Sequence, residues 1–215
     1  IETTKEIHLY EVALSAFVAL FVIIDPIGNT PIFVALTQGT DSKHRRAMAI
    51  KGPLVAMLIL TLFAWVGTDL LGILGISMPA FKIAGGLMLA VIAFEMVFEK
   101  RNRRKSKSAE ELNKVTDPDD ISVCPIAIPM LAGPGSIATV MLLMVKHQND
   151  LTSQFIVIGA LAVVLTACLV LYLLSGWFER FIGQTVSNVI TRLLGVILSA
   201  LAVQFVTDGL LQIFV

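Results

Sequence analysis

Charged residues are scarce in this chain. Asp, Glu, Lys and Arg make up 15% of its 215 residues, whereas soluble proteins contain about 25%. Hydrophobic residues make up 56%, and a soluble monomer of this composition would expose apolar patches larger than such proteins tolerate. The 16 acidic and 16 basic residues cancel, so net charge does not suggest nucleic acid as a partner. The composition excludes an ordinary soluble domain and indicates a membrane protein.

Residues that mark enzyme or metal chemistry are also few. The two cysteines, Cys124 and Cys168, lie in apolar segments without the spacing of a metal site. The chain has no GxSxG, HExxH or Walker A motif. We therefore expect no metal, no cofactor and no enzymatic activity, and we do not expect this chain to be an ATP-driven pump.

Long apolar runs fill most of the sequence. A helix needs about 20 apolar residues to cross a bilayer, and six segments meet that length. They are Leu9–Leu36, Ala47–Leu71, Phe81–Phe98, Val123–Val145, Ser153–Leu174 and Val189–Phe214. The predicted fold class is an all-α polytopic membrane protein.

Residues 100–122 form the only long polar stretch, basic at first and then acidic. This linker divides the chain into residues 1–99 and residues 123–215, with three predicted spans each. Because three is odd, a second copy of the first half would insert upside down. Asp25-Pro26 aligns with Gly133-Pro134 at a separation of 108 residues. The sequence therefore predicts two inverted three-helix repeats, an architecture of many transporters.

The basic residues predict the orientation. Of the 16 Lys and Arg residues, 13 fall on the side of the membrane that carries the linker. Lys and Arg accumulate on the cytoplasmic side of membrane proteins. We expect a multi-pass protein of the inner membrane, with a cytoplasmic linker and both termini outside.

Two helix-breaking runs interrupt predicted spans at matching places in the two halves. They are Asp25–Pro31, with the sequence DPIGNTP, and Gly133–Ser136, with the sequence GPGS. Backbone groups left unpaired at membrane depth are tolerated only inside protein or beside a wet cavity. A matched pair of broken helices indicates a substrate site near the bilayer midplane.

The residue types at these breaks suit a small zwitterion. We expect the first span to resume as a helix around Asn29 or Thr30, and Ser136 to cap the resumed half of the fourth. Free N–H groups at helix N-termini bind carboxylates, and Asp25 with nearby carbonyls would bind an ammonium group. The predicted substrate-binding residues are Asp25, Pro26, Gly28, Asn29, Thr30, Gly133, Pro134, Gly135 and Ser136.

Each of these residues has a simpler interpretation. Asp25 would serve only as a helix cap, and Pro26 and Pro31 only as kinks. Ser136 and Thr139 would pair with freed carbonyls instead of substrate. Glu95, one turn inside the third span, either extends its carboxylate to the membrane surface or carries a proton in coupling.

Two segments resemble the signatures of the MarC family of integral membrane proteins. Ile24–Phe33 matches the first signature, and Pro125–Thr139 matches the second. The matching residues are Asp25, Pro26, Gly28, Asn29 and Pro31, and then Pro129, Gly133, Pro134 and Gly135. The resemblance implies a six-span inner-membrane protein that transports small neutral amino acids such as glycine and alanine.

These observations lead to one main hypothesis and two rivals. The main hypothesis is a secondary active transporter of small neutral amino acids that works by alternating access. Protons or Na⁺ would drive it, with Asp25 and Glu95 as coupling candidates. A passive channel, or an exporter for another small polar solute, is the alternative. An intramembrane aspartyl enzyme is disfavoured, because Gly133 stands where a second carboxylate is needed. The expected partners are the amino acid and the bilayer, and the sequence does not predict the oligomeric state.

Overall fold

The computed structural model describes residues 2–37, 40–101, 104, 107, 130–175 and 183–214. The regular elements in these residues are helices: α1 (Glu2–Ile24), α2 (Pro26–Leu36), α3 (Ser42–Ile73), α4 (Met78–Val97), α6 (Pro134–Lys146), α7 (Leu151–Leu173) and α9 (Gly183–Phe214). The described chain is therefore all-α, as the sequence predicts.

Five of the six predicted spans appear as helices long and apolar enough to cross a bilayer. The first of them is α1 with α2, which together form the apolar stretch Glu6–Leu36. The fourth predicted span is represented by α6, a shorter apolar helix of 13 residues. The start of that span, residues 123–129, lies outside the described residues, and so does most of the linker.

Short polar side chains cap the N-termini of three of the long helices. The carboxylate of Asp41 accepts a hydrogen bond from His44 N at 2.7 Å before α3. Ser77 has the same role before α4, and Asp150 has it before α7. Such caps satisfy amides that have no partner inside the helix. The helix ends are therefore set locally, by polar residues between the apolar runs.

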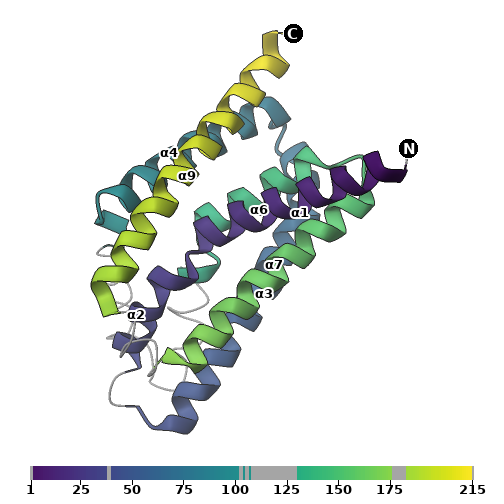
Figure 1. Cartoon of the computed structure of the whole chain (residues 1–215). Coiled ribbons are helices and arrows are strands. Elements are labelled where there is room, and N and C mark those ends of the chain that lie inside the picture. The colour runs from purple at the N-terminus through teal and green to yellow at the C-terminus, as the bar shows by residue number, and fades with distance from the viewer. Residues whose placement is uncertain are drawn as a thin grey trace.

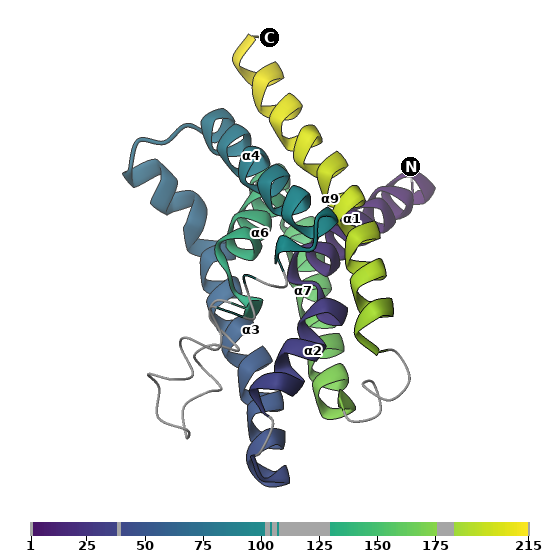
Figure 2. The same ribbon diagram turned by 90° about the vertical axis from the view of Figure 1, so that its left-hand side faces the viewer.

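The helices pack in three layers (Figures 1 and 2). The pair α4·α9 forms one outer layer, and the pair α3·α7 forms the other. Between them lie α1, α2 and α6; α6 packs against α3 and α4, and α1 against α7 and α9. Every residue from Ala138 to Val145 of α6 is buried. The two predicted break regions therefore lie in the middle layer, away from lipid.

Glycines bring α4 and α9 into close contact. A Cβ added to Gly86 would lie 2.8 Å from the carbonyl oxygen of Ala202, and one added to Gly195 would lie 2.8 Å from Cβ of Met96. The two helices run antiparallel, because Gly209, near the end of α9, meets Pro79 at the start of α4. Small residues let helix backbones approach closely in membranes. This pair is therefore tightly packed along its length.

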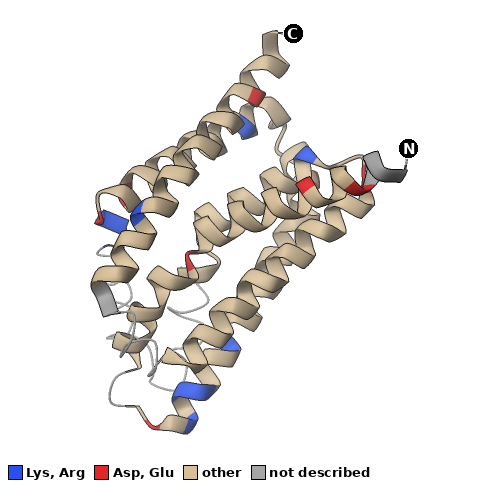
Figure 3. Ribbon diagram, viewed as in Figure 1, with Lys and Arg blue, Asp and Glu red and all other residues tan. Residues whose placement is uncertain are grey.

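The outer helices present apolar side chains on their outward faces. Among the exposed large apolar residues are Leu54, Leu58 and Leu62 of α3, Leu87 and Phe94 of α4, and Leu193, Val196 and Val203 of α9. In Figure 3 the middle of the molecule carries few charges, and basic residues gather at the end where α3 begins. Exposed apolar surface of this extent marks contact with a membrane.

Candidate functional site

The first helix break is confined to one residue. Asp25 has φ 56° and ψ 66°, a left-handed conformation that few non-glycine residues adopt. Helix α1 ends at Ile24, and α2 begins at once with Pro26. The expectation that the helix resumes around Asn29 or Thr30 is therefore wrong. Proline fits the first helical position, because its fixed φ is helical and no N–H is needed there.

The Asp25 side chain caps the new helix. Its Oδ1 accepts a hydrogen bond from Gly28 N at 3.0 Å, and the hydroxyl of Thr191 on α9 lies 3.2 Å from Oδ2. A Cβ at position 28 would lie 2.2 Å from Oδ2, so only glycine leaves room for this carboxylate. Asp25 is 1% exposed. The residue is therefore a helix cap, held from a second helix as well.

Side chains replace the backbone donors that the break removes. Pro31 lies inside α2 and has no N–H for the carbonyl of Ile27. Ser187 of α9 donates to that carbonyl at 3.1 Å. The carbonyl of Ile24 accepts from Asn29 Nδ2 at 2.6 Å. The break is thus closed by hydrogen bonds, which membrane-buried backbone requires.

The second predicted break gives a helix N-terminus deep in the bundle. Gly133 occupies the cap position in an extended conformation, and Pro134 begins α6. Ser136 therefore lies inside the first turn, and the expectation that it caps the helix is wrong, because Pro134 already fits the first helical position. The hydroxyl of Thr139 donates to the carbonyl of Gly135 at 2.8 Å.

Both interruptions lie about half a bilayer from a helix end. The 11 residues of α2 extend about 16 Å, and the 13 residues of α6 extend about 20 Å, at 1.5 Å per residue. The two helices lead from the interruptions toward opposite ends of the bundle (Figures 1 and 2). A hydrocarbon core is about 30 Å thick. Each interruption therefore lies one short helix away from an end of the bundle.

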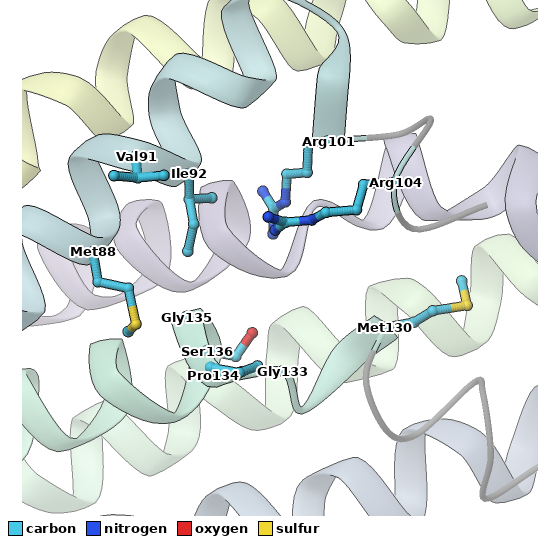
Figure 4. A pocket seen from close by; sticks show the side chains of 10 residues that line it. All are labelled: Met88, Val91, Ile92, Arg101, Arg104, Met130, Gly133, Pro134, Gly135 and Ser136. Carbon is cyan, nitrogen blue, oxygen red and sulfur yellow. The ribbon is translucent and has the colours of Figure 1, made fainter. Parts of the chain in front are cut away.

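A cavity of about 360 Å³ opens at the N-terminus of α6, between α6 and α4 (Figure 4). The residues that line it are Met88, Val91, Ile92, Arg101, Arg104, Met130, Gly133, Pro134, Gly135 and Ser136. The first amides of a helix lack intrahelical partners and carry the positive end of its dipole. The cavity is therefore apolar on its α4 side and electropositive beside α6.

Arg101 connects this cavity to the first break. Its side chain is 5% exposed, and Nη2 donates to the carbonyl of Ile23 in the last turn of α1. Nη1 lies 2.8 Å from the sulfur of Met96. The guanidinium also interacts electrostatically with Asp25. Arg101 thus lines the cavity and binds the helix end that precedes Asp25.

Arg104 reaches the cavity in a different way. Its Nη1 lies 2.6 Å from Oε1 of Glu95, and 59% of its side chain is exposed. The other carboxylate oxygen of Glu95 is buried without a hydrogen-bond partner among the described residues. A second ion pair, Arg192–Glu99 at 2.6 Å, joins α9 to the residues after α4. Glu95 is therefore an ion-paired residue at the cavity rim.

Comparison with known proteins identifies the family. The family model described as "MarC family integral membrane protein" matches residues 10–214. The chain belongs to the MarC family. Its relatives include a UPF0056 membrane protein of Aquifex aeolicus, 37% identical over 92% of this chain and 91% of that protein. UPF0056 membrane protein YvbG of Bacillus subtilis is 34% identical over 96% of this chain and 97% of that one. No solved structure matches significantly.

In this MarC-family protein the predicted site residues lie in two separate places. Four of them line the cavity: Gly133, Pro134, Gly135 and Ser136. The other five lie at or just after the first break and do not line the described cavity: Asp25, Pro26, Gly28, Asn29 and Thr30. The hydroxyl of Thr30 donates to the carbonyl of Pro26 at 2.8 Å, within α2. Pro129, the remaining residue of the second signature, lies outside the described residues.

Sequence reasoning missed the residues that join the two groups. Arg101 and Arg104 lie in the basic part of the predicted linker, Thr191 lies in the predicted sixth span, and Ser187 lies just before that span. Nothing in a run of six basic residues marks one of them as buried. The one available signal is distance along the chain, because Arg101 follows the end of α4 by four residues. Within the described residues, no group of His, Cys, Asp or Glu is arranged to hold a metal ion.

Proposed function

We propose that this MarC-family protein is a secondary active transporter of small neutral amino acids, such as glycine, alanine and serine, across the inner membrane. The observation that carries the proposal is the cavity at the N-terminus of α6, near mid-depth of the bundle. Helix N-termini at the bilayer midplane form the substrate sites of several transporter folds. The cavity also lies between the middle layer and an outer helix pair, so movement of that pair would open or close it.

The charges around the cavity favour a zwitterion. The amides of α6 with Arg101 and Arg104 would hold a carboxylate. Asp25, which interacts electrostatically with Arg101, provides the opposite charge and would attract an ammonium group. A small amino acid carries both charges within a few ångströms. The volume of about 360 Å³ leaves space for such a molecule with water.

The packing supports the inverted repeat on which alternating access would depend. In such a repeat α1 with α2 corresponds to α6, α3 to α7, and α4 to α9. The contact of α1 with α7 is then matched by that of α6 with α3. The contact of α4 with α6 is matched by those of α9 with α1 and α2. Two related halves of this kind can exchange conformations, which would expose the site to each side in turn.

The orientation in this proposal follows the basic residues. Among the described residues, Lys43, Arg45, Arg46 and Lys51 lie in the first turns of α3, the end of the molecule where basic residues gather in Figure 3. Lys82 and Lys146 lie toward the other end. We place the basic end in the cytoplasm. The linker, residues 100–122, would then be cytoplasmic and both termini outside.

Uptake into proteoliposomes tests the function. Purified protein would be reconstituted, and radiolabelled glycine and alanine supplied under an imposed proton gradient or, separately, a Na⁺ gradient. A carrier gives saturable uptake and counterflow, driven by one of the gradients. Flux that rises without saturation would instead indicate a channel. Absence of uptake under either gradient, with folded protein, would contradict the assignment of amino acids as substrates.

Replacing Asp25 with Asn tests its charge with little change of shape. Asparagine also adopts the left-handed conformation and keeps an oxygen for Gly28 N, so the fold should survive. We expect gradient-driven uptake to fall at least about tenfold, because the negative charge of Asp25 at the break is removed. Glu95→Gln is the companion variant, since Glu95 is the other coupling candidate. Unchanged binding and transport in Asp25→Asn would show that Asp25 is a cap alone.

A further inference from the structure

Arg101 is a buried charge that faces a cavity. Its side chain is 5% exposed, yet none of the described carboxylates forms an ion pair with it, whereas Arg104 and Arg192 each have one. Its nearest described partners are a carbonyl oxygen and a sulfur atom. A guanidinium has five N–H donors, so these two contacts leave donors available to the cavity. A buried charge without a counter-charge in contact is costly, and an anion in the cavity would remove that cost.

The rest of the described cavity lining, like Arg101, favours a negatively charged ligand. None of the described residues that line it is acidic. The N-terminus of α6 adds the positive end of a helix dipole and the unpaired amides of its first turn. The charge of Arg104 is already balanced by Glu95, at 2.6 Å. Arg101 is therefore the cation at the cavity that has no carboxylate in contact among the described residues; Asp25 acts on it electrostatically, and its remaining donors can bind the carboxylate of a small molecule.

Ser136 gives an independent indication of a ligand. The residue is 3% exposed and lines the cavity, and its hydroxyl makes no hydrogen bond to the part of the chain that the structure describes. In Figure 4 the hydroxyl oxygen points toward the side of the cavity that holds Arg101 and Arg104. The oxygen faces the cavity, so a molecule bound there can reach it. Its position beside Arg101 suits an oxygen atom of a bound molecule.

We infer that this cavity binds the carboxylate of a small monocarboxylic substrate through Arg101, Ser136 and the first amides of α6, and that Arg101 selects it. The inference rests on the proposed function for the identity of the substrate, an amino acid. Arg101 would form the paired N–H···O contacts that guanidinium and carboxylate groups favour. Met88, Ile92 and Met130 would surround the carbon chain. Asp25 would lie toward the ammonium end.

Equilibrium binding to the purified full-length protein in detergent, by calorimetry, tests the carboxylate site apart from transport. The probes are glycine, propionate, which has no ammonium group, glycinamide, which has no carboxylate, and inorganic phosphate. We expect glycine and propionate to bind saturably, and glycinamide at least about tenfold more weakly than glycine, since a charge-assisted hydrogen bond is lost. Equal binding of glycinamide, or binding of phosphate without propionate, would overturn the inference.

Variants of Arg101 assign the selection to one residue. Arg101→Gln should weaken propionate binding about tenfold or more and remove the preference for glycine over glycinamide. Arg101→Lys keeps the charge, so the preference should persist with lower affinity. Arg192→Gln is the matched control, because it removes an ion-paired arginine that does not line the cavity. Unchanged selectivity in folded Arg101→Gln would contradict the role of Arg101.

Ser136→Ala keeps the inference testable where Arg101→Gln does not fold. Its hydroxyl has no hydrogen bond to lose within the described chain, so the melting temperature should stay the same. Propionate affinity should fall about fivefold, and unchanged affinity would contradict the site. Binding of carboxylates without any uptake would contradict the transporter proposal and support the carboxylate site. Uptake that is unchanged in both Arg101→Gln and Ser136→Ala would contradict the carboxylate site and leave the transporter proposal standing.

Discussion

At the scale of single residues, the backbone of the first break depends on Asp25 and Gly28 as a pair. Asp25 turns the chain with a left-handed conformation, and its carboxylate fills the space that a side chain at position 28 would need. The pattern of Asp, Pro and Gly in an apolar run predicts that the helix is disturbed here. It does not predict that one residue is enough, because that depends on hydrogen bonds from Arg101, Ser187 and Thr191, which come from distant parts of the sequence.

Gly28→Ala tests this pair. The new methyl group would lie 2.2 Å from Oδ2 of Asp25 and 2.7 Å from the hydroxyl of Thr191, so atoms must move. Overpacking of this kind costs about 1–3 kcal/mol, and we expect the melting temperature in detergent to fall by several degrees. Gly159→Ala on α7 is the control, because nothing lies within 4 Å of its added Cβ. A Gly28→Ala protein as stable as the control would show that the break has room to relax.

At the scale of helices, the sequence predicts well where each helix lies along the chain, and it predicts poorly which helices contact one another. Runs of apolar residues and polar caps decide where α3, α4 and α7 lie, and both are visible locally. The charged linker, residues 100–122, shows this at the point where it leaves α4. Its first basic residues continue past α4, and Arg101 enters the bundle because a carbonyl at the end of α1 accepts its guanidinium. A contact across 78 residues leaves no pattern in the sequence.

The contact between α9 and α2 gives a prediction at this scale. Ser187 donates to the carbonyl that Pro31 cannot serve. Ser187→Ala should therefore destabilise the protein by about 1 kcal/mol, in the range of hydrogen bonds between membrane helices. Ser199→Ala is the matched control, because that exposed hydroxyl bonds within its own helix.

A double-mutant cycle tests whether Ser187 acts through the carbonyl of Ile27, which Pro31 leaves without a backbone donor. Pro31→Ala restores an N–H to α2 that can reach the carbonyl of Ile27. In that background the loss of Ser187 should cost clearly less, as measured by thermal unfolding in detergent. Strict additivity of the two changes would mean that Ser187 acts elsewhere.

At the scale of the whole molecule, the orientation can be tested with single cysteines. In a background without Cys124 and Cys168, Asn149→Cys lies between α6 and α7, and Ser42→Cys lies at the start of α3; both positions are exposed. Because basic residues gather near Ser42, we expect an impermeant maleimide on intact cells to label Asn149→Cys at least about tenfold faster. Faster labelling of Ser42→Cys would reverse the proposed topology. Equal labelling of both after lysis is the control.

The length of the outer helices has a consequence for the lipid environment. Helices α3 and α9 have 32 residues each, or about 48 Å, and both exceed a hydrocarbon core of about 30 Å. The first turns of α3 carry Lys43, Arg45, Arg46 and Lys51 and extend beyond the core, and the apolar remainder of each helix fits the core by tilting. Helix α6 is enclosed by protein and does not meet the lipid along Ala138–Val145. A thinner bilayer would therefore tilt α9 together with α4, which packs along it, while α6 keeps its place, so lipid chain length acts on the cavity through its α4 wall.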